Sequence, residues 1–463
     1  MSRMVEFHEI LAEWTYGIES DFVLNGTPAS WRSGQPIAWG DEARKIELDD
    51  NAYDCCVSAD EKFLALAIGR LVHIYDLENL ELRDVLIGHT EKIGRVEFFP
   101  LDITCNKYKL VSSSKSNRGL DAMIIVWTLD KQGKNTNKPA DSVDIEGLAA
   151  TATEEAMRTL ISSNGWMKEQ AEVDKLLAAV KEMVSRADKR HILQDNLVLS
   201  GELTGLGSRA VSDDGKLLVY LSDNHLRRQI VVWDIDKGEK KLVLEGHTDQ
   251  VMWANVSPDG KIVASVSWDQ TVKLWDTSTG RLIHDIGPTG GQNWAGVFSP
   301  DSKYIAFSRG NPSTIVYVHT VLEGTRICEI EVSTHWLRSL SWSHEGHHLA
   351  AGGLCGVVYV WNPLSGEQKQ KWQLKERYHG MLETGSVQWL DSKGMMLAYK
   401  GTEGGVNVYD MLENQKWRSD PKKSDLIKLT KIVSGQWTLH YLRKANQLIS
   451  VDSDQTVRFW VIN

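Results

Sequence analysis

The feature that most constrains this chain is a sequence pattern that recurs along most of its length. Short apolar runs end in an aromatic residue that is often followed by aspartate. The clearest copy is GHTDQVMWANVSPDGKIVASVSWDQTVKLWD, at residues 246–276. Its apolar alternation and Asp/Gly-containing turns predict three short strands. A period of a few tens of residues is typical of repeat proteins, in which each unit packs against its neighbours.

The ends of the third strands can be counted along the chain, and eight are found. The step from Trp233 to Trp275 is 42 residues, which fits the ~40–45-residue period of a four-stranded unit. We therefore predict an all-β chain of eight units, and seven is the alternative if one end is misassigned. The predicted ends are Tyr75, Trp127, Trp233, Trp275, Val318, Trp361, Tyr409 and Trp460.

The unit at residues 246–276 resembles the WD-repeat (WD40) family at its initial Gly-His, its SPDG turn and its final Trp-Asp. The resemblance covers residues 43–130 and 196–463. It implies a WD40-type β-propeller, in which four-stranded blades form a ring. We expect one propeller over residues 43–463, most simply with eight blades. The last repeat ends after its third strand, so the resemblance implies that an N-terminal strand, Ala43–Asp50, closes the ring.

Two segments lie outside the resemblance. Residues 1–42 form an N-terminal extension that we expect to pack on the propeller. Residues 131–195 interrupt the second blade before a predicted outer strand at residues 196–202. Apolar residues recur in this insertion at helical spacing and predict a helix. We expect the helical insertion to dock on the propeller, and a partner-binding helix is the alternative. The apolar stripe comprises Val173, Leu176, Leu177, Val180, Met183 and Val184.

The resemblance also implies hydrogen-bonded sets inside the blades, each formed by a histidine, a serine, an aspartate and a tryptophan. Buried imidazole and indole nitrogens need partners, so we interpret these residues as structural rather than catalytic. The fourth blade has His247, Ser265, Asp269 and Trp275. The second has His89, Asp121 and Trp127, with Ser113 as the expected serine, and the eighth keeps Ser450, Asp454 and Trp460.

Charge and motifs exclude several kinds of function. The formal charge is −10, from 52 basic and 62 acidic residues, so direct nucleic-acid binding is not expected. Metalloprotease, phosphate-loop, dinucleotide and nucleophile-elbow motifs are missing from the sequence. We predict no catalytic residue, metal or cofactor, and a non-catalytic role is favoured over an enzyme.

The N-terminus and the cysteines bear on location. The first residues do not form a basic start followed by an apolar run, and no run reaches the ~18 apolar residues of a membrane span. The five cysteines include no CxxC pair. We expect no membrane association and a cytoplasmic or nuclear location.

A candidate partner-binding face emerges from the tryptophans, of which there are 18 against 8 phenylalanines. Four are not accounted for by the repeat pattern or the extensions. When the blades are aligned on their turns, these four lie near the mouth of the central channel that a ring of blades would enclose. Tryptophan and arginine are the side chains that interaction hot spots favour. The predicted set is Trp268, Trp294, Trp336, Trp437, Arg338, Gln250, Gln292, Tyr53, Lys92 and Arg95.

These observations favour a non-catalytic interaction scaffold that binds a protein or peptide through this face. One alternative is a small-molecule-binding or enzymatic propeller with a pocket at the channel mouth. Another is an acidic propeller that acts in chromatin or ribosome-assembly complexes by capturing a basic partner.

Overall fold

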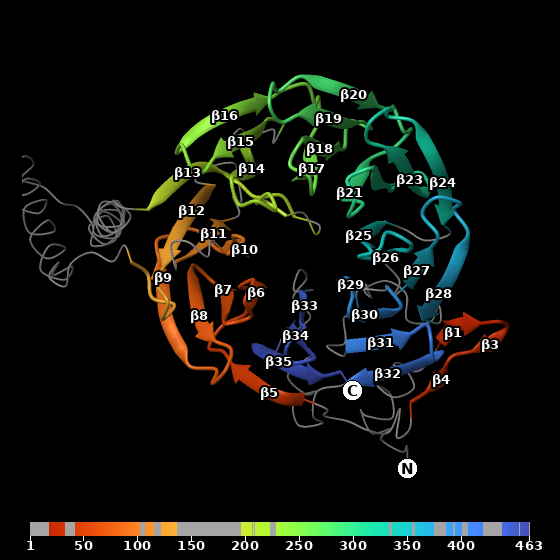
Figure 1. Ribbon diagram of the computed structural model, residues 1–463, viewed down its shortest axis with the longest axis horizontal. Coiled ribbons are helices and arrows are strands. Elements are labelled where there is room, and N and C mark those ends of the chain that lie inside the picture. The colour runs from red at the N-terminus through yellow and green to blue at the C-terminus, as the bar shows by residue number, and fades with distance from the viewer. Residues whose placement is uncertain are drawn as a thin grey trace, which may run out of the picture.

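Small β-sheets arranged as a ring make up the described part of the chain in the computed structural model (Figure 1). Every regular element in this part is a strand, which confirms the expected all-β, propeller-like fold. The described residues are 18–32, 42–101, 107–114, 122–136, 196–205, 207, 209–222, 228–332, 336–353, 357–374, 386–391, 394–400, 406–419, 438–452 and 454–462.

Three sheets contain four strands each in chain order. The first has β6 (Ala52–Val57), β7 (Phe63–Ile68), β8 (Leu71–Asp76) and β9 (Leu82–Ile87). The second has β17 (Val251–Val256), β18 (Ile262–Ser267), β19 (Val272–Asp276) and β20 (Leu282–Ile286). The third has β21 (Asn293–Phe298), β22 (Tyr304–Arg309), β23 (Thr314–Thr320) and β24 (Arg326–Val332).

A seven-stranded sheet spans two successive repeats. Its strands β13 and β14 are joined by two residue pairs, Gly201↔Ser222 and Glu202↔Leu221. The outer strand predicted at residues 196–202 is β13. The strands are β10 (Ile93–Phe98), β11 (Tyr108–Ser114), β12 (Met123–Leu129), β13 (Leu197–Glu202), β14 (Leu217–Ser222), β15 (Ile230–Asp234) and β16 (Glu239–Leu244).

The remaining sheets combine C-terminal strands with strands from the N-terminal residues. One has β25 (Leu337–Trp342), β26 (Leu349–Gly353), β27 (Val357–Trp361), β28 (Gln368–Leu374) and β1 (Ile18–Ser20). The next has β29 (Val387–Trp389), β30 (Met396–Lys400), β31 (Val406–Asp410), β32 (Gln415–Ser419) and β4 (Ser30–Trp31). The last has β33 (Leu439–Leu442), β34 (Gln447–Asp452), β35 (Thr456–Val461) and β5 (Glu42–Glu47), and β2 (Val23–Leu24) pairs with β3 (Thr27–Pro28).

N-terminal strands lie on the outside of the C-terminal sheets. Strand β5 pairs antiparallel with β35, and β4 pairs parallel with β32. Between β1 and β2, the fully buried ring of Phe22 stacks on Tyr409 with 4.0 Å between centroids. The N-terminal residues are therefore part of the packed structure at this edge. Of the helical insertion predicted at residues 131–195, residues 137–195 lie outside the described residues, so the predicted helix is not tested.

The core lies between neighbouring sheets, because alternate side chains of each strand face opposite sides. Strand β7 is buried along its whole length. Trp253 of β17 packs toward the next sheet, where a Cβ on Gly296 would come within 2.7 Å of the indole. The glycine therefore makes room for the tryptophan between the two sheets.

One predicted strand end is wrong by a residue. Tyr304 pairs with Thr320 and Ile305 pairs with His319, as Ile262 pairs with Asp276 and Val263 with Trp275 in the preceding sheet. His319, rather than Val318, therefore occupies the tryptophan position. Its ring is buried against Phe307, with 5.4 Å between centroids, so an imidazole replaces the indole where the sequence pattern favoured an aliphatic residue.

Candidate functional site

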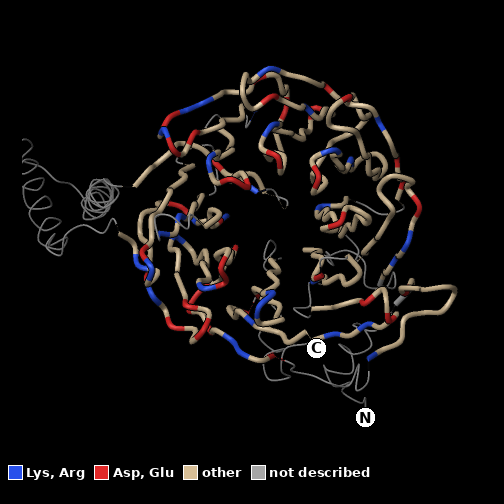
Figure 2. The backbone as a smooth tube through the Cα atoms, in the orientation of Figure 1, with Lys and Arg blue, Asp and Glu red and all other residues tan. Residues whose placement is uncertain are grey.

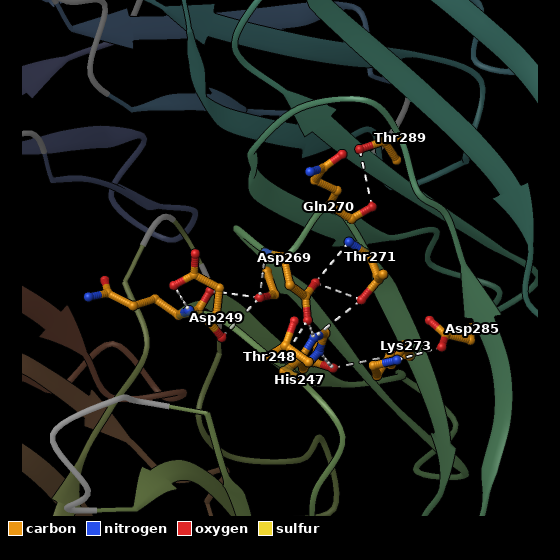
Figure 3. Close-up of polar contacts among 12 residues, drawn as sticks. His247, Thr248, Asp249, Asp269, Gln270, Thr271, Lys273, Asp285 and Thr289 are labelled. Carbon is orange, nitrogen blue, oxygen red and sulfur yellow. Dashed lines mark hydrogen bonds and ion pairs between the residues drawn. The ribbon is translucent and has the colours of Figure 1, made fainter.

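The set predicted at residues 247–275 forms a continuous chain of hydrogen bonds, and Figure 3 shows the part of it around His247 and Asp269. The Nδ1 of His247 lies 2.7 Å from the Asp269 carboxylate, which can only accept, so Nδ1 carries the proton. In the neutral ring Nε2 then accepts from the Ser265 hydroxyl at 2.8 Å, and Trp275 Nε1–H donates to the same oxygen at 3.0 Å. All four side chains are used in holding strands β18 and β19 to the preceding loop.

Asp269 is held as a carboxylate by several donors. Burial opposes its charge, but hydrogen bonds from His247 and Thr271 and from the backbone N–H of Thr248 outweigh that effect and lower its pKa. The His–Asp pair has a serine on its far side, but its side chains are almost fully buried. This arrangement is suited to structure and leaves no access for a substrate.

The second set differs from the sequence prediction in its serine. Ser112, not Ser113, lies 2.6 Å from His89 Nε2 and accepts from Trp127 Nε1–H at 2.8 Å. The register explains the correction: Ser112 pairs with Ile125, two residues before Trp127, just as Ser265 pairs with Lys273, two residues before Trp275. Ser113 points the other way and accepts the backbone N–H of Leu203.

His89 is buried, and the described residues place no carboxylate beside it. Asp121, its predicted partner, lies outside the described residues. Among the described residues the Nδ1 of His89 has no hydrogen-bond partner. Burial lowers the pKa of His89 to about 3, so the ring is neutral.

The last repeat keeps the Trp–Ser pair and has a buried cation close to it. Trp460 Nε1–H donates to Ser450 Oγ at 2.8 Å. Asp454 receives two hydrogen bonds from the fully buried Arg458, which also donates to Asp452 at 2.7 Å. These carboxylates raise the pKa of Arg458 against the effect of burial. Asp454 therefore holds a guanidinium here, and the set is again structural.

Three of the four selected tryptophans meet in one array with Arg338, which we call the aromatic array: Trp268, Trp294, Trp336 and Arg338. The Trp268 and Trp294 rings are edge-to-face with centroids 5.1 Å apart, and Trp294 and Trp336 are stacked at 5.2 Å. The Arg338 guanidinium lies over both stacked rings, at 5.4 and 5.5 Å from their centroids. All four side chains are half-buried.

Backbone contacts from three neighbouring sheets position the array. Trp268 follows β18, and its N–H donates to the Gln250 carbonyl at 2.9 Å. Trp294 is on β21 and Trp336 immediately precedes β25, two of the innermost strands of the ring (Figure 1). A Cβ on Gly310 would come within 2.6 Å of Trp336 and 2.8 Å of Trp294, so both rings rest on this glycine.

Gly310 was not among the predicted site residues, although the sequence holds a signal for it. Gly310 follows β22 in the turn SRGNPS, where a strand without a large side chain allows rings from neighbouring loops to approach. Its N–H donates to the Gln292 carbonyl at 2.8 Å. Gln250 and Gln292 therefore contribute to the array through backbone carbonyls, and their side chains are half-buried.

The other predicted face residues do not join the array. Lys92 Nζ donates to Tyr53 OH at 3.1 Å and lies 5.4 Å from the centre of its ring, and this bond raises the pKa of Lys92. Arg95 lies 3.5 Å from Asp54 and 3.6 Å from Glu97. Trp437 lies outside the described residues. The predicted face thus contains one aromatic array and one separate Tyr–Lys pair.

Two kinds of feature are absent from the described residues. They contain no group of three or more histidine, cysteine, aspartate or glutamate side chains placed to hold a metal ion. They also contain no helix that is long and apolar enough to cross a membrane.

Comparison with known proteins identifies the repeats. The WD40 family model (WD domain, G-beta repeat) matches residues 238–276 and 325–362. The WD repeat-containing protein SL1-17 of Schistosoma mansoni is 25% identical over 210 residues, which are 42% of this chain and 63% of that protein. Eukaryotic translation initiation factor 3 subunit I of Neurospora crassa is 36% identical over 186 residues, 37% of this chain and 51% of that subunit.

A ribosomal protein and a designed protein extend the comparison. The small ribosomal subunit protein RACK1y of Oryza sativa subsp. japonica is 28% identical over 138 residues, which cover 29% of this chain and 41% of that protein. Each of these three matches spans less than two thirds of the relative's length. The crystal structure of the computationally designed Ika8 protein shares the fold with a TM-score of 0.60 at 17% identity, over 91% of this chain and 100% of the designed chain. Together with the repeat pattern, the family model and the relatives named as WD-repeat proteins show that the chain contains WD40 repeats.

Proposed function

We propose that this protein is a non-catalytic scaffold and that the aromatic array binds a protein segment. The observation that carries the proposal is the convergence of three indoles and a guanidinium from three neighbouring sheets. Large rigid rings bury much surface and lose little entropy, which is why binding hot spots favour tryptophan and arginine. Two similar proteins are named as parts of larger assemblies, a translation initiation factor and a ribosomal subunit.

The polar atoms of the array also support a binding role. Among the described residues, the indole N–H groups of Trp268 and Trp294 are buried and have no hydrogen-bond partner. An unsatisfied buried donor costs roughly 1–3 kcal/mol, so the array is not arranged for stability alone. A carbonyl group of a bound segment would supply an acceptor after a small shift of the rings.

The scaffold we propose is an eight-bladed ring closed by β5. Three observations support this count: the eight repeat ends, the weak two-pair join between β13 and β14 within the seven-stranded sheet, and the pairing of β5 with β35. Pairing an N-terminal strand with β35 covers the outer edge of β35, which would otherwise be open to pairing with another chain.

The proposal is tested by recovering partners with wild-type protein and with Trp336→Ala, using cell lysate and quantitative mass spectrometry. Trp31→Ala is the matched control, because Trp31 is also half-buried but lies on the outer strand β4. We expect the wild type and Trp31→Ala to enrich the same proteins, and Trp336→Ala to lose them at least tenfold. A recovered partner is then titrated against purified protein by tryptophan fluorescence. Equal recovery by a folded Trp336→Ala variant would remove the array from the proposal.

A further inference from the structure

Three turns on one face of the ring carry exposed leucines. Leu322, Leu364 and Leu412 are 80%, 47% and 60% exposed. Each lies three residues after the aromatic position at the end of a third strand, in the turn that leads to the outer strand. Because the strands of each sheet are antiparallel, all turns of this kind emerge on the same face of the ring.

The repeat provides an internal comparison, because the same turn position holds polar residues elsewhere. It is Glu78 between β8 and β9, Asp130 after β12, Asp236 between β15 and β16, and Ser278 between β19 and β20. The three sheets that carry the leucines are neighbours and pack against one another. The leucines therefore occupy one arc of the face. We call Leu322, Leu364 and Leu412 the leucine arc.

Hydrogen bonds hold the leucine turns in place. The N–H groups of Leu364 and Leu412 donate to the side chains of Asn362 and Asp410, at 3.0 and 2.8 Å. The carbonyl of Leu322 lies 2.8 Å from His284 Nε2 on the preceding sheet. Each leucine side chain is thus presented to solvent from a fixed backbone, as a preformed contact point requires.

The charges beside the leucine arc are acidic. Among the described residues Glu323 and Glu413, each following an arc leucine, are exposed and have no ion-pair partner. The nearby bases are already paired: Arg326 with Glu329 at 2.5 Å, and Lys369 with Glu367 at 2.8 Å. Charged residues of both signs are interspersed around the ring (Figure 2), and at the arc the exposed carboxylates of Glu323 and Glu413 each stand next to an exposed leucine.

We propose that the leucine arc docks an amphipathic, basic segment of a protein partner. Apolar side chains of the segment cover the leucines, and its lysines or arginines face Glu323 and Glu413. The acidic flanks select a basic segment over an acidic one by charge complementarity. This interaction is separate from the aromatic array, which is built on strand ends of the opposite face.

The test uses a fluorescein-labelled 18-residue peptide of leucine and lysine arranged with helical periodicity, and measures its binding by anisotropy at physiological ionic strength. We expect Leu322→Ser/Leu364→Ser/Leu412→Ser to weaken binding at least tenfold, and Glu323→Gln/Glu413→Gln about threefold. The control is Glu78→Gln/Asp130→Asn/Asp236→Asn, which removes three acids from the equivalent turns and should change Kd less than twofold. Trp336→Ala should bind the peptide as wild type does.

Several outcomes would overturn the proposal. If the control weakens binding as much as the leucine variant does, the peptide responds only to net charge. If the leucine variant binds normally, the arc is not the docking surface. Light scattering decides whether the arc instead joins two copies of this chain. If the wild type is a dimer and the leucine variant is a monomer, the arc mediates self-association and does not bind a partner. The substituted leucines are solvent-exposed, so matching melting curves should show that each variant is folded.

Discussion

Two hydrogen-bonded sets in this ring share a tryptophan, a serine and a histidine. They differ in the partner that the described residues provide at Nδ1 of the histidine. In the set between β18 and β19, Asp269 accepts from His247 Nδ1 and fixes the tautomer of the ring. In the set between β11 and β12, His89 keeps its serine and tryptophan but has no described partner at Nδ1. Within the described residues, both histidines therefore share the serine and tryptophan contacts, and a carboxylate contact is described for His247 alone.

The Trp–Ser pair is the constant part of the described sets. The tryptophan indole donates to a serine two residue pairs away in all three sets, at 3.0, 2.8 and 2.8 Å. Among the described residues, the serine contacts a histidine paired with aspartate in the first set and a histidine in the second, and in the third it donates to Asp452, which also accepts from Arg458. The variable member decides how the stability of each sheet responds to mutation and to pH.

The largest effect is expected from removing the carboxylate that distinguishes the first set. Asp269→Ala leaves the buried donor of His247 and the half-buried donors of Thr271 without an acceptor, together with the exposed N–H of Thr248. We expect a loss of about 3 kcal/mol in the free energy of unfolding, measured by urea denaturation. Asp236→Ala, an exposed aspartate, is the control and should cost less than about 0.5 kcal/mol. A loss below 1 kcal/mol for Asp269→Ala would show that the carboxylate is dispensable for the stability of this set.

Acid should affect the two sets in different pH ranges. The pKa of His89 falls from 6.5 to about 3 in the folded protein. Between these pH values the unfolded chain therefore binds a proton at His89 that the folded chain does not bind. Stability from this histidine is present above pH 6.5 and is lost by about 1.4 kcal/mol per pH unit down to about pH 3. Asp269, whose pKa is lowered, keeps its contribution above its usual pKa of 3.8 and loses it only below.

This contrast is measured by comparing urea denaturation at pH 7 and pH 5. Wild type should lose about 2 kcal/mol through His89 at pH 5, and His89→Gln should lose that much less. Other histidines with lowered pKa, including His440 and His348, contribute to the total acid loss, so the difference between the two proteins is the informative quantity. Equal losses in both proteins would place the acid sensitivity elsewhere.

The fold could be predicted from the sequence because the repeat carries it. The Trp-Asp ends, the Asp/Gly turns and apolar alternation specify strands and their order, and no long-range information is needed. The set around His247 was also predictable, since its four residues stand at family positions. His319 was misplaced by one residue because alternation cannot tell an aliphatic from a buried imidazole.

The aromatic array was predictable in part. Counting from each turn identified Trp268, Trp294, Trp336 and Arg338 as neighbours on one face, and the structure brings them together. The same count could not show that Arg95 does not join the array, because its charge is balanced by Asp54 on β6 of the neighbouring sheet and by Glu97 two residues along its own strand. Which side chains pair depends on the register of the strands. Residue spacing in the sequence predicts that register only where the turns between strands have constant length.

The smallest effect tests that dependence on register at the expanded turn after β11. Ser112→Ala removes the acceptor of Trp127 Nε1–H and the partner of His89, whereas Ser113→Ala removes the acceptor of one backbone N–H, that of Leu203. We expect losses in the free energy of unfolding of about 2 and about 1 kcal/mol, a difference of about 1 kcal/mol. Ser112→Ala should also change the fluorescence of Trp127, and Ser113→Ala should leave it unaltered. The reverse order of stabilities would restore Ser113 as the shared serine and overturn the register drawn for this sheet.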